Sequence, residues 1–170
     1  MTLEHDEHLC KTYPRLFTNP DGSPTCWDFS CGDGWYPILD TLCRCLMRRH
    51  DELQMEIQGL QTRLAAGRPQ HEWESESPED RLQSLTQTFE SLQMPSILQM
   101  KEKFGTLRVY AIGGAGVHEL IEFAELMSAV TCETCGAPGT VRVSKRSWIK
   151  TRCDACDKEK KDTAGYGYGV

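Results

Sequence analysis

Two short motifs determine the fold of the C-terminal third of the chain, Cys132-Glu-Thr-Cys135-Gly and, later, Cys153-Asp-Ala-Cys156. These two Cys-x-x-Cys pairs are separated by 17 residues, which is a spacing typical of a four-cysteine zinc site. Zinc in structural sites takes four tetrahedral ligands, and thiolates bind it well. Because four thiolates leave no position for a reacting water, we expect one structural Zn²⁺ ion. The predicted ligands are Cys132, Cys135, Cys153 and Cys156.

The residues between the two pairs predict a zinc ribbon. Residues 140–144 and 147–151 have the composition of two short strands, and Lys145-Arg146 would form the turn between them. Two disulfides are the alternative to a metal. The chain has nine cysteines, an odd count, and its acidic first residues lack the apolar core of a secretory signal. We therefore expect reduced thiols and zinc, as in an intracellular protein.

Charge is spread unevenly along the 170 residues, whose formal net charge is −6. Residues 132–163 hold eight Lys/Arg and five Asp/Glu, whereas residues 1–131 hold eleven Lys/Arg and twenty Asp/Glu. Such an acidic body excludes a bulk nucleic-acid coat protein but allows protein binding, or local nucleic-acid contact through the ribbon. No apolar run approaches the roughly 20 residues that a membrane helix needs, so we expect a cytoplasmic protein that does not bind membranes.

The first 34 residues are polar and rich in turn-forming residues, and we expect them to be irregular. Cys10, Cys26 and Cys31 lie here, with His5 and His8 close by, so a second metal site is one hypothesis. The Cys-x4-Cys spacing of Cys26 and Cys31 is looser than that of a zinc knuckle. Buried apolar thiols are the alternative.

A long amphipathic helix is predicted from residue 35 to about residue 66, with Asp33 as its N-cap. Leucines recur every seven residues, and a second seam contains His50, which is an a/d heptad pattern that could form a coiled coil. Such a stripe must pack against another helix of the chain or against a second copy in a homodimer. The residues predicted for this interface are Leu39, Leu46, Leu53, Ile57, Leu60 and Leu64.

A second helix is predicted after an acidic linker at residues 67–77. Ser77 would be its N-cap and Pro78 its first residue, while Pro95 ends the segment. The apolar stripe at Leu82, Leu85, Phe89 and Leu92 would complete an antiparallel helical hairpin over residues 35–94.

Residues 95–130 change periodicity and predict two strands that turn at Lys103-Phe104-Gly105, followed by a helix from residue 117 to 129. The intervening Gly113-Gly-Ala-Gly116 resembles a phosphate-binding loop only in outline, and a plain turn is the alternative. We therefore expect an α+β fold with a long helical hairpin, a small β-hairpin plus helix, the ribbon at 131–157 and a disordered tail at 158–170. The helix residues predicted to face inward are Val117, Leu120, Ile121, Ala124 and Met127.

Three motifs together resemble a family of uncharacterised zinc-ribbon proteins from bacteriophages and prophages. They are Cys31-Gly-Asp-Gly-Trp35, the stretch Lys101-Glu-Lys-Phe-Gly-Thr-Leu-Arg-Val-Tyr110 with Gly113-Gly114, and the two cysteine pairs. The resemblance covers residues 26–50 and 97–156. It implies a phage gene product that acts in the bacterial cytoplasm, and it implies no reaction.

Three functions are weighed. The first is a non-enzymatic accessory protein that binds a host protein and inhibits an anti-phage defence system. The second is an enzyme with Cys31, Asp33 and His50 as reacting groups, which no surrounding motif supports. The third is a nucleic-acid-binding regulator that uses the ribbon. Its predicted contact residues are Arg142, Lys145, Arg146, Trp148, Lys150 and Arg152.

Overall fold

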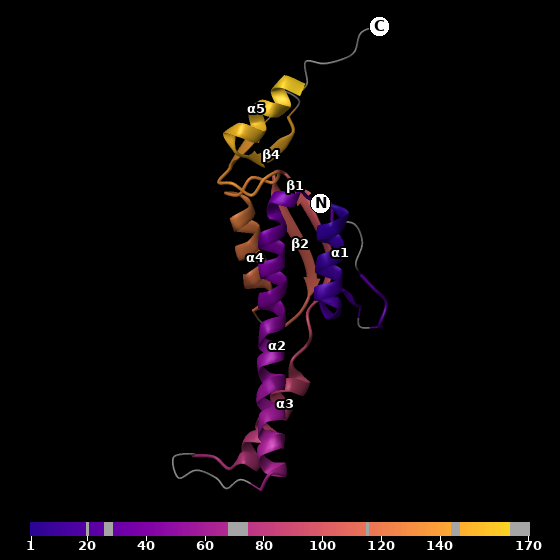
Figure 1. The fold of residues 1–170 in the computed structure, drawn as a ribbon, viewed down its shortest axis with the longest axis vertical. Coiled ribbons are helices and arrows are strands. Elements are labelled where there is room, and N and C mark those ends of the chain that lie inside the picture. Colours follow the sequence, from indigo (N-terminus) through magenta and orange to yellow (C-terminus); the bar gives the residue numbers. More distant parts are fainter. Residues whose placement is uncertain (20, 26–28, 68–74, 115, 144–146, 164–170) are drawn as a thin grey trace.

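The computed structural model describes residues 1–19, 21–25, 29–67, 75–114, 116–143 and 147–163, the last five as backbone only. The molecule is elongated, and one long helix runs through most of its length (Figure 1). A compact body and the cysteine-rich ribbon gather at one end of this helix. The elements are α1 (Leu3–Thr12), η1 (Pro14–Phe17), η2 (Asp33–Trp35), α2 (Tyr36–Ala65), α3 (Pro78–Ser91), β1 (Ser96–Lys103), β2 (Thr106–Ile112), α4 (Val117–Ser128), β3 (Thr140–Val143), β4 (Ile149–Arg152) and α5 (Asp154–Thr163).

The first part of the N-terminal segment is regular, so the prediction of an irregular segment over residues 1–34 is wrong for residues 3–17, whereas the described residues from 18 to 32 belong to no helix or named strand. It forms α1 and η1, and it contributes Leu9, Leu16 and Phe17 to the core at no more than 3% exposure. The spacing of Leu9, Tyr13, Leu16 and Phe17 is that of one helix face, and this signal was present in the sequence. The turn-forming residues that follow it obscured the pattern.

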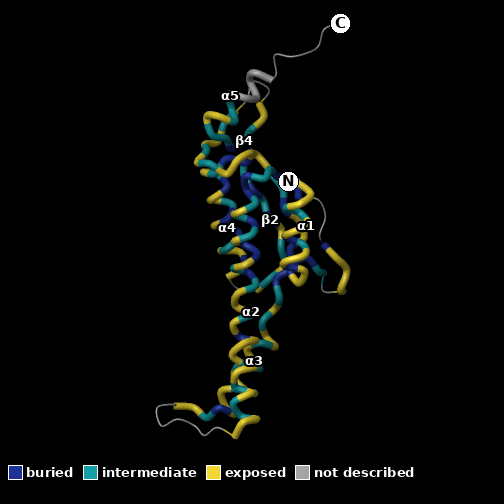
Figure 2. Tube along the Cα trace, in the orientation of Figure 1, coloured by how far each residue is buried: buried dark blue, intermediate teal, exposed yellow. Residues whose placement is uncertain are grey.

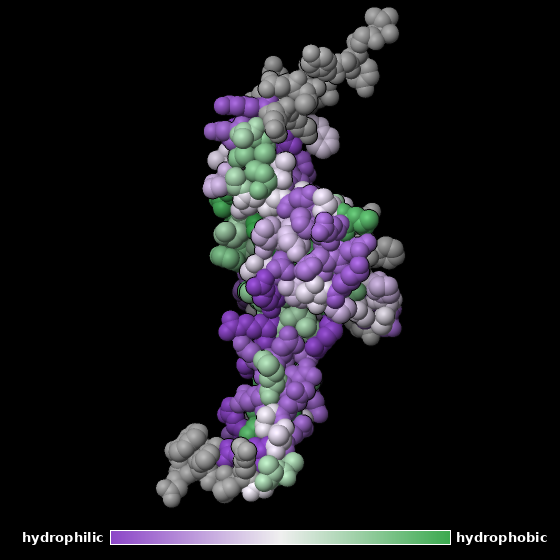
Figure 3. All heavy atoms as spheres, in the orientation of Figure 1, coloured by the Kyte–Doolittle hydropathy of each residue, from purple (hydrophilic) through white to green (hydrophobic). Residues whose placement is uncertain are grey.

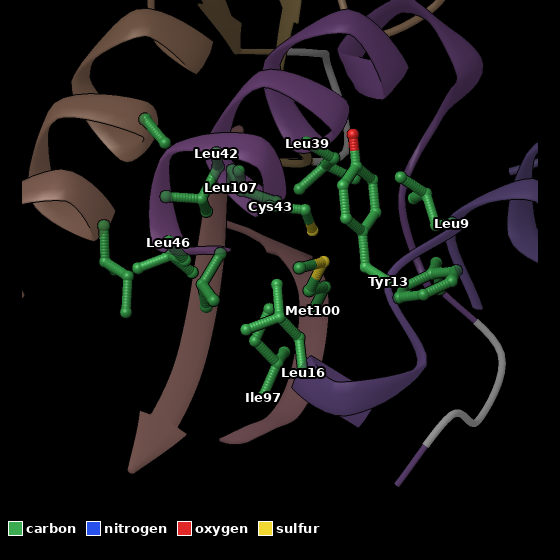
Figure 4. Close-up of a cluster of buried hydrophobic side chains, with 14 of the residues drawn as sticks. Leu9, Tyr13, Leu16, Leu39, Leu42, Cys43, Leu46, Ile97, Met100 and Leu107 are labelled. Carbon is green, nitrogen blue, oxygen red and sulfur yellow. The ribbon is translucent and has the colours of Figure 1, made fainter. Parts of the chain in front are cut away.

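The core lies around the first half of α2. Leu39 and Cys43 are fully buried there, and they meet side chains of α1, η1 and β1 (Figure 4). Cys43 is thus an apolar packing residue, and burial raises the pKa of its thiol. The other main members of this cluster, all buried, are Leu9, Tyr13, Leu16, Leu42, Leu46, Ile97, Met100 and Leu107.

The second half of α2 pairs with α3, as the predicted helical hairpin requires. Ser77 caps α3, because its hydroxyl accepts a hydrogen bond from the Asp80 N–H at 3.0 Å. The predicted α2 interface divides between the two halves. Leu39, Leu46 and Leu53 are at most 5% exposed, so other parts of the same chain cover them. Ile57, Leu60 and Leu64 are half-buried, and a homodimer through this part of α2 stays a prediction.

The β-hairpin forms as predicted, with β1 and β2 antiparallel. Phe104 and Gly105 form its turn at φ values of 54° and 81°, which is the geometry that two-residue hairpin turns favour. A β-bulge between Ile97 and Gln99 interrupts the register near the start of β1.

Helix α4 packs on α2 and β2. Val117, Ile121 and Ala124 are buried as predicted, but Met127 is 40% exposed. Ser128 takes the inward place instead, since its hydroxyl accepts a hydrogen bond from the Leu107 N–H at 2.8 Å. A purely apolar pattern could not identify that position.

The C-terminal segment is helical further than expected. Helix α5 continues to Thr163, so the predicted disorder from residue 158 is wrong up to that point. The rest of the predicted tail, residues 164–170, lies outside the described residues.

Candidate metal centre

The four predicted ligands meet at one point. The Sγ atoms of Cys132, Cys135, Cys153 and Cys156 all lie within 4.8 Å of one another. Tetrahedral zinc with Zn–S bonds of about 2.3 Å requires sulfur atoms about 3.8 Å apart. The Cys135 and Cys153 sulfurs are 3.7 Å apart, so the donor set and its geometry both fit one zinc ion.

The first cysteine pair is held in a tight backbone loop. The Gly136 N–H donates to the Cys132 carbonyl at 2.9 Å, and the Cys132 N–H donates to the Ala137 carbonyl at 2.7 Å. Gly136 has φ 77°, a conformation that glycine adopts without steric cost. Cys132 is fully buried, whereas Cys135 is exposed.

The second pair lies at the start of α5. Cys153 directly precedes the helix, and its Sγ accepts from the Cys156 N–H at 3.5 Å. The antiparallel strands β3 and β4 join the two pairs, with Thr140 opposite Arg152. This is the predicted ribbon hairpin, although its turn at residues 144–146 lies outside the described residues.

Electrostatics distinguish the four thiols when no ion is bound. Burial acts to raise the pKa of Cys132, but backbone N–H groups of Cys153 and Cys135 outweigh it and lower this pKa to about 6. Hydrogen bonds with Cys135 and Cys153 raise the pKa of Cys156. A bound metal cation would favour the deprotonated form of the thiols that hold it.

The ribbon is fastened to the body through the Cys31–Trp35 stretch. The Gly34 N–H donates to the Glu133 carbonyl at 2.9 Å, and the indole Nε1–H of Trp35 donates to the Thr131 carbonyl at 2.8 Å. Trp35 is fully buried. The predicted role of Asp33 as the N-cap of α2 is wrong, because its carboxylate accepts from the Thr2 N–H at 2.7 Å and contacts His5 Nδ1 at 3.0 Å.

The β1–β2 turn provides a second attachment. The Thr151 hydroxyl donates to the Gly105 carbonyl at 2.6 Å. The Lys150 ammonium lies 2.6 Å from a carboxylate oxygen of Glu102 and 3.0 Å from one of Glu133. Gly34 and Trp35, the β1–β2 turn and the residues beside the two cysteine pairs thus meet at one place, where the body joins the ribbon.

Two of the six predicted nucleic-acid contact residues, Arg142 and Lys150, are paired with acidic side chains of the same chain. Lys150 is bound by two carboxylates, and Arg142 pairs with Asp154 and, at 3.6 Å, with Asp157. Trp148 is 67% exposed and Arg152 is half-buried. Lys145 and Arg146 lie outside the described residues.

A second metal site from Cys10, Cys26 and Cys31 gains no support. Cys10 is disulfide-bonded, so it cannot be a thiolate ligand, and the expectation of reduced thiols fails at this position. Cys26 lies outside the described residues. Cys31 is 7% exposed, and its burial raises the pKa of its thiol to about 12. Within the described part of the chain, the four ribbon cysteines are the one group of at least three metal-ligating side chains.

The structure does not bring together Cys31, Asp33 and His50, the reacting groups of the enzyme hypothesis. His50 lies 14 residues along α2 from Tyr36, or about 21 Å at 1.5 Å per residue. It contacts Arg15 at 2.6 Å, and its ring centroid lies 4.4 Å from that of Phe89 with the rings tilted by 57°, far from Cys31 and Asp33. The protonated, buried thiol of Cys31 also lacks the thiolate character of a nucleophile.

Helix α4 also carries exposed apolar side chains on the side away from the core, which the inward stripe does not predict. Phe123 is 64% exposed, Leu126 63%, Met127 40% and Val130 57%. Phe123, Leu126 and Met127 are spaced i, i+3 and i+4, so they share one side of α4, away from the buried side, and Val130 follows just after the helix ends at Ser128. Figure 3 shows hydrophobic side chains gathered in the region of α4. The signal was present as a second apolar stripe at helical spacing, beside the one that faces the core.

Compared with protein-family models, curated proteins and solved structures, the chain matches none of them. Among the described residues, no helix combines the length and the apolar content that are needed to cross a bilayer.

Proposed function

We propose that this chain is a non-enzymatic, zinc-stabilised accessory protein that acts by binding another protein. The phage origin, the host target and the inhibition of an anti-phage defence system are parts of the proposal that rest on the resemblance of the three motifs. The observation that carries protein binding is the exposed apolar surface formed by Phe123, Leu126 and Met127 of α4 and by Val130 just after the helix. We call these four residues the α4 face.

The α4 face has the composition of the centre of a protein interface. Aromatic side chains and methionine are enriched in such centres, whereas charged residues are depleted there. Three of its four residues are more than half exposed, although together they span only eight positions of the chain. Clustered exposed apolar side chains of this kind mark interaction sites more often than single ones do.

The basic hairpin supports the nucleic-acid alternative less well. Phosphate contacts need lysine and arginine side chains that are free to replace counterions. Arg142 and Lys150 instead neutralise acidic side chains of the same chain. The described part of the hairpin therefore presents less positive charge than its sequence suggests.

The experiment is an affinity pull-down from a bacterial lysate, with and without nuclease, after the zinc content of the bait has been measured by elemental analysis. The baits are the wild type, the double variant Phe123→Ser/Leu126→Ser and the control Met55→Ser. Met55 is 64% exposed on the distal part of α2, so the control removes an equally exposed apolar side chain elsewhere. We expect one zinc ion per chain.

A host protein that is enriched regardless of nuclease, lost with the double variant and retained with Met55→Ser is the expected result. Enrichment that disappears with nuclease would favour the nucleic-acid alternative. Retention of the same partner by the double variant would contradict the assignment of the α4 face.

A further inference from the structure

We infer that Gly32, Gly34 and Trp35 position the first cysteine pair, so that metal binding and packing of the body form one cooperative unit. We call these three residues the glycine platform. The inference rests on the proposed zinc site and goes beyond it, because a zinc ribbon is usually expected to fold as a module of its own.

The platform contacts the loop that carries Cys132 and Cys135, which we call the metal loop, and this contact leaves no room for a side chain. A Cβ atom on Gly34 would lie 2.1 Å from the Cys132 carbonyl oxygen, 2.5 Å from the Gly136 nitrogen and 2.8 Å from the Cys135 nitrogen. A Cβ atom on Gly32 would lie 2.3 Å from the Glu133 carbonyl oxygen. All these atoms belong to backbone, which cannot swing aside as a flexible side chain would.

Hydrogen bonds fix the ligand Cys132 from both of its neighbours. Trp35 donates to the carbonyl of Thr131, and Gly34 donates to the carbonyl of Glu133. Because Thr131 and Glu133 flank Cys132 directly, the platform sets the path of the backbone that carries this ligand. A metal ligand held in this way by its surroundings binds more tightly than a mobile one.

The β1–β2 turn holds the other side of the same loop. Glu133 donates its N–H to the Thr151 carbonyl at 3.0 Å, and Thr151 is bound to Gly105 through its hydroxyl. Lys150 joins Glu133 to Glu102 of β1. Thr151 and Cys132 are both fully buried, so this is a packed interface rather than a surface contact.

Zinc binding and packing of the platform should be thermodynamically coupled. If zinc orders the loop that packs on the platform, then zinc stabilises the platform, and the platform must raise zinc affinity by the same factor. Removal of zinc from a detached ribbon would loosen residues 131–157 alone. Removal from this protein is expected to loosen residues 31–36 and 102–107 as well.

The first test compares zinc affinity in the full-length wild type, Gly34→Ala and Gly59→Ala, by competition with a chromophoric chelator. We expect Gly34→Ala to bind zinc about 10- to 100-fold more weakly, as is typical when a supporting contact of a metal ligand is lost. Gly59 has nothing within 4 Å of its added Cβ, so Gly59→Ala should retain wild-type affinity. The absorption spectrum of Co²⁺-substituted protein should show tetrahedral thiolate coordination in all three proteins.

The second test needs no variant. Hydrogen exchange of the wild type is followed by mass spectrometry before and after zinc is removed with a chelator. Faster exchange at residues 31–36 and 102–107, besides the ribbon, is the expected result. Lys150→Met provides a milder variant if Gly34→Ala does not fold, and we expect it also to weaken zinc binding.

The outcomes separate this inference from the zinc proposal. If the wild type binds one zinc ion, but Gly34→Ala or Lys150→Met binds it equally well and chelation affects only residues 131–157, the inference is wrong and the zinc site stands. If the wild type holds no zinc, both are wrong.

Discussion

The two halves of α2 follow the same heptad pattern but have different surroundings. In the first half, Leu39 and Leu46 are at most 5% exposed, because α1, α4 and the β-hairpin surround the helix (Figures 1 and 2). In the second half, Leu60 and Leu64 are only half-buried, and α3 is the element that packs on them. A heptad pattern thus indicates that a helix face is covered, but neither by which element nor how completely.

The two halves meet at His50. This side chain is buried on α2, between Arg15 of η1, which lies 2.6 Å away, and the ring of Phe89 of α3. Asp51 is the other charged group beside it, at 3.8 Å. His50 therefore joins the body to the helical hairpin, and the predictions below address either side of this junction.

The largest difference should come from shortening one leucine in each half. Leu39→Ala should reduce the free energy of unfolding by about 2–5 kcal/mol, because it leaves a cavity in a packed core. Leu60→Ala should reduce it by about 1 kcal/mol, because solvent already reaches that side chain. Urea unfolding followed by circular dichroism measures both values. Equal losses would show that the two halves are equally well packed.

The junction should make stability depend on pH. Burial, followed by the nearby Arg15 cation, lowers the pKa of His50 below its usual value of 6.5. The unfolded chain therefore binds this proton at a higher pH than the folded chain does. The stability that His50 contributes is fully present above about pH 6.5, the pKa of histidine in the unfolded chain. It should be lost as the pH falls through the lower pKa that His50 has in the folded protein.

Urea unfolding at pH 7.5 and pH 5.5 tests this dependence, with His50→Gln as the control that cannot titrate. The lowered carboxyl pKa values of Asp33 and Asp40 act at more acidic pH, whereas the lowered pKa of Cys132, about 6, lies inside this range. The contribution of His50 is therefore the part of the pH dependence that His50→Gln removes. A slope that is unchanged in His50→Gln would assign the effect to another group.

The cap of α3 should have a smaller and local effect. Ser77→Ala removes the hydroxyl that accepts from the Asp80 N–H and should cost about 0.5–2 kcal/mol in stability. Ser77→Gly should cost only a few tenths of a kcal/mol, since glycine is tolerated at N-caps. Faster hydrogen exchange should be confined to residues 78–91. Spread of the effect into the body would mean that the two halves unfold together.

The exposed ion pair between the helices should have the smallest effect. Arg81 contacts Glu56 at 2.6 Å, but both side chains are about half exposed, and such pairs contribute little to stability. Arg81→Ala should therefore change stability less than Ser77→Ala does, and added salt should reduce the difference further. A loss as large as that of Leu39→Ala would show that this pair, rather than apolar packing, holds the hairpin closed.

The meeting of the four cysteines could be predicted from the sequence, whereas the surroundings of the cluster could not. The spacing of the four cysteines limits how they can meet, and their sulfurs do meet. The Cys31–Trp35 motif stands out in the sequence, but local pattern predicts only an N-cap at Asp33 for it, which is wrong. Its glycines are needed because the metal loop crosses them, and that loop begins about 100 residues later in the chain.

The apolar helix α4 shows the same limit on the outside of the molecule. Its two stripes are both readable from the sequence, yet one is buried and the other, with Phe123 and Leu126, is exposed. Which stripe faces the core depends on where α2 and β2 lie. The polar Ser128 at the centre of the inward face could be found only from the Leu107 N–H that it satisfies.

By itself, the sequence determined the features that depend on neighbouring residues. These are the long helix, the cap at Ser77, the two-residue turn at Phe104-Gly105 and the cysteine spacing, each set by contacts within a few positions of the chain. The tertiary structure alone decided the features that join distant segments. Trp35 finds Thr131 across 96 residues and Lys150 finds Glu102 across 48, and such pairings depend on burial and packing that no local pattern encodes.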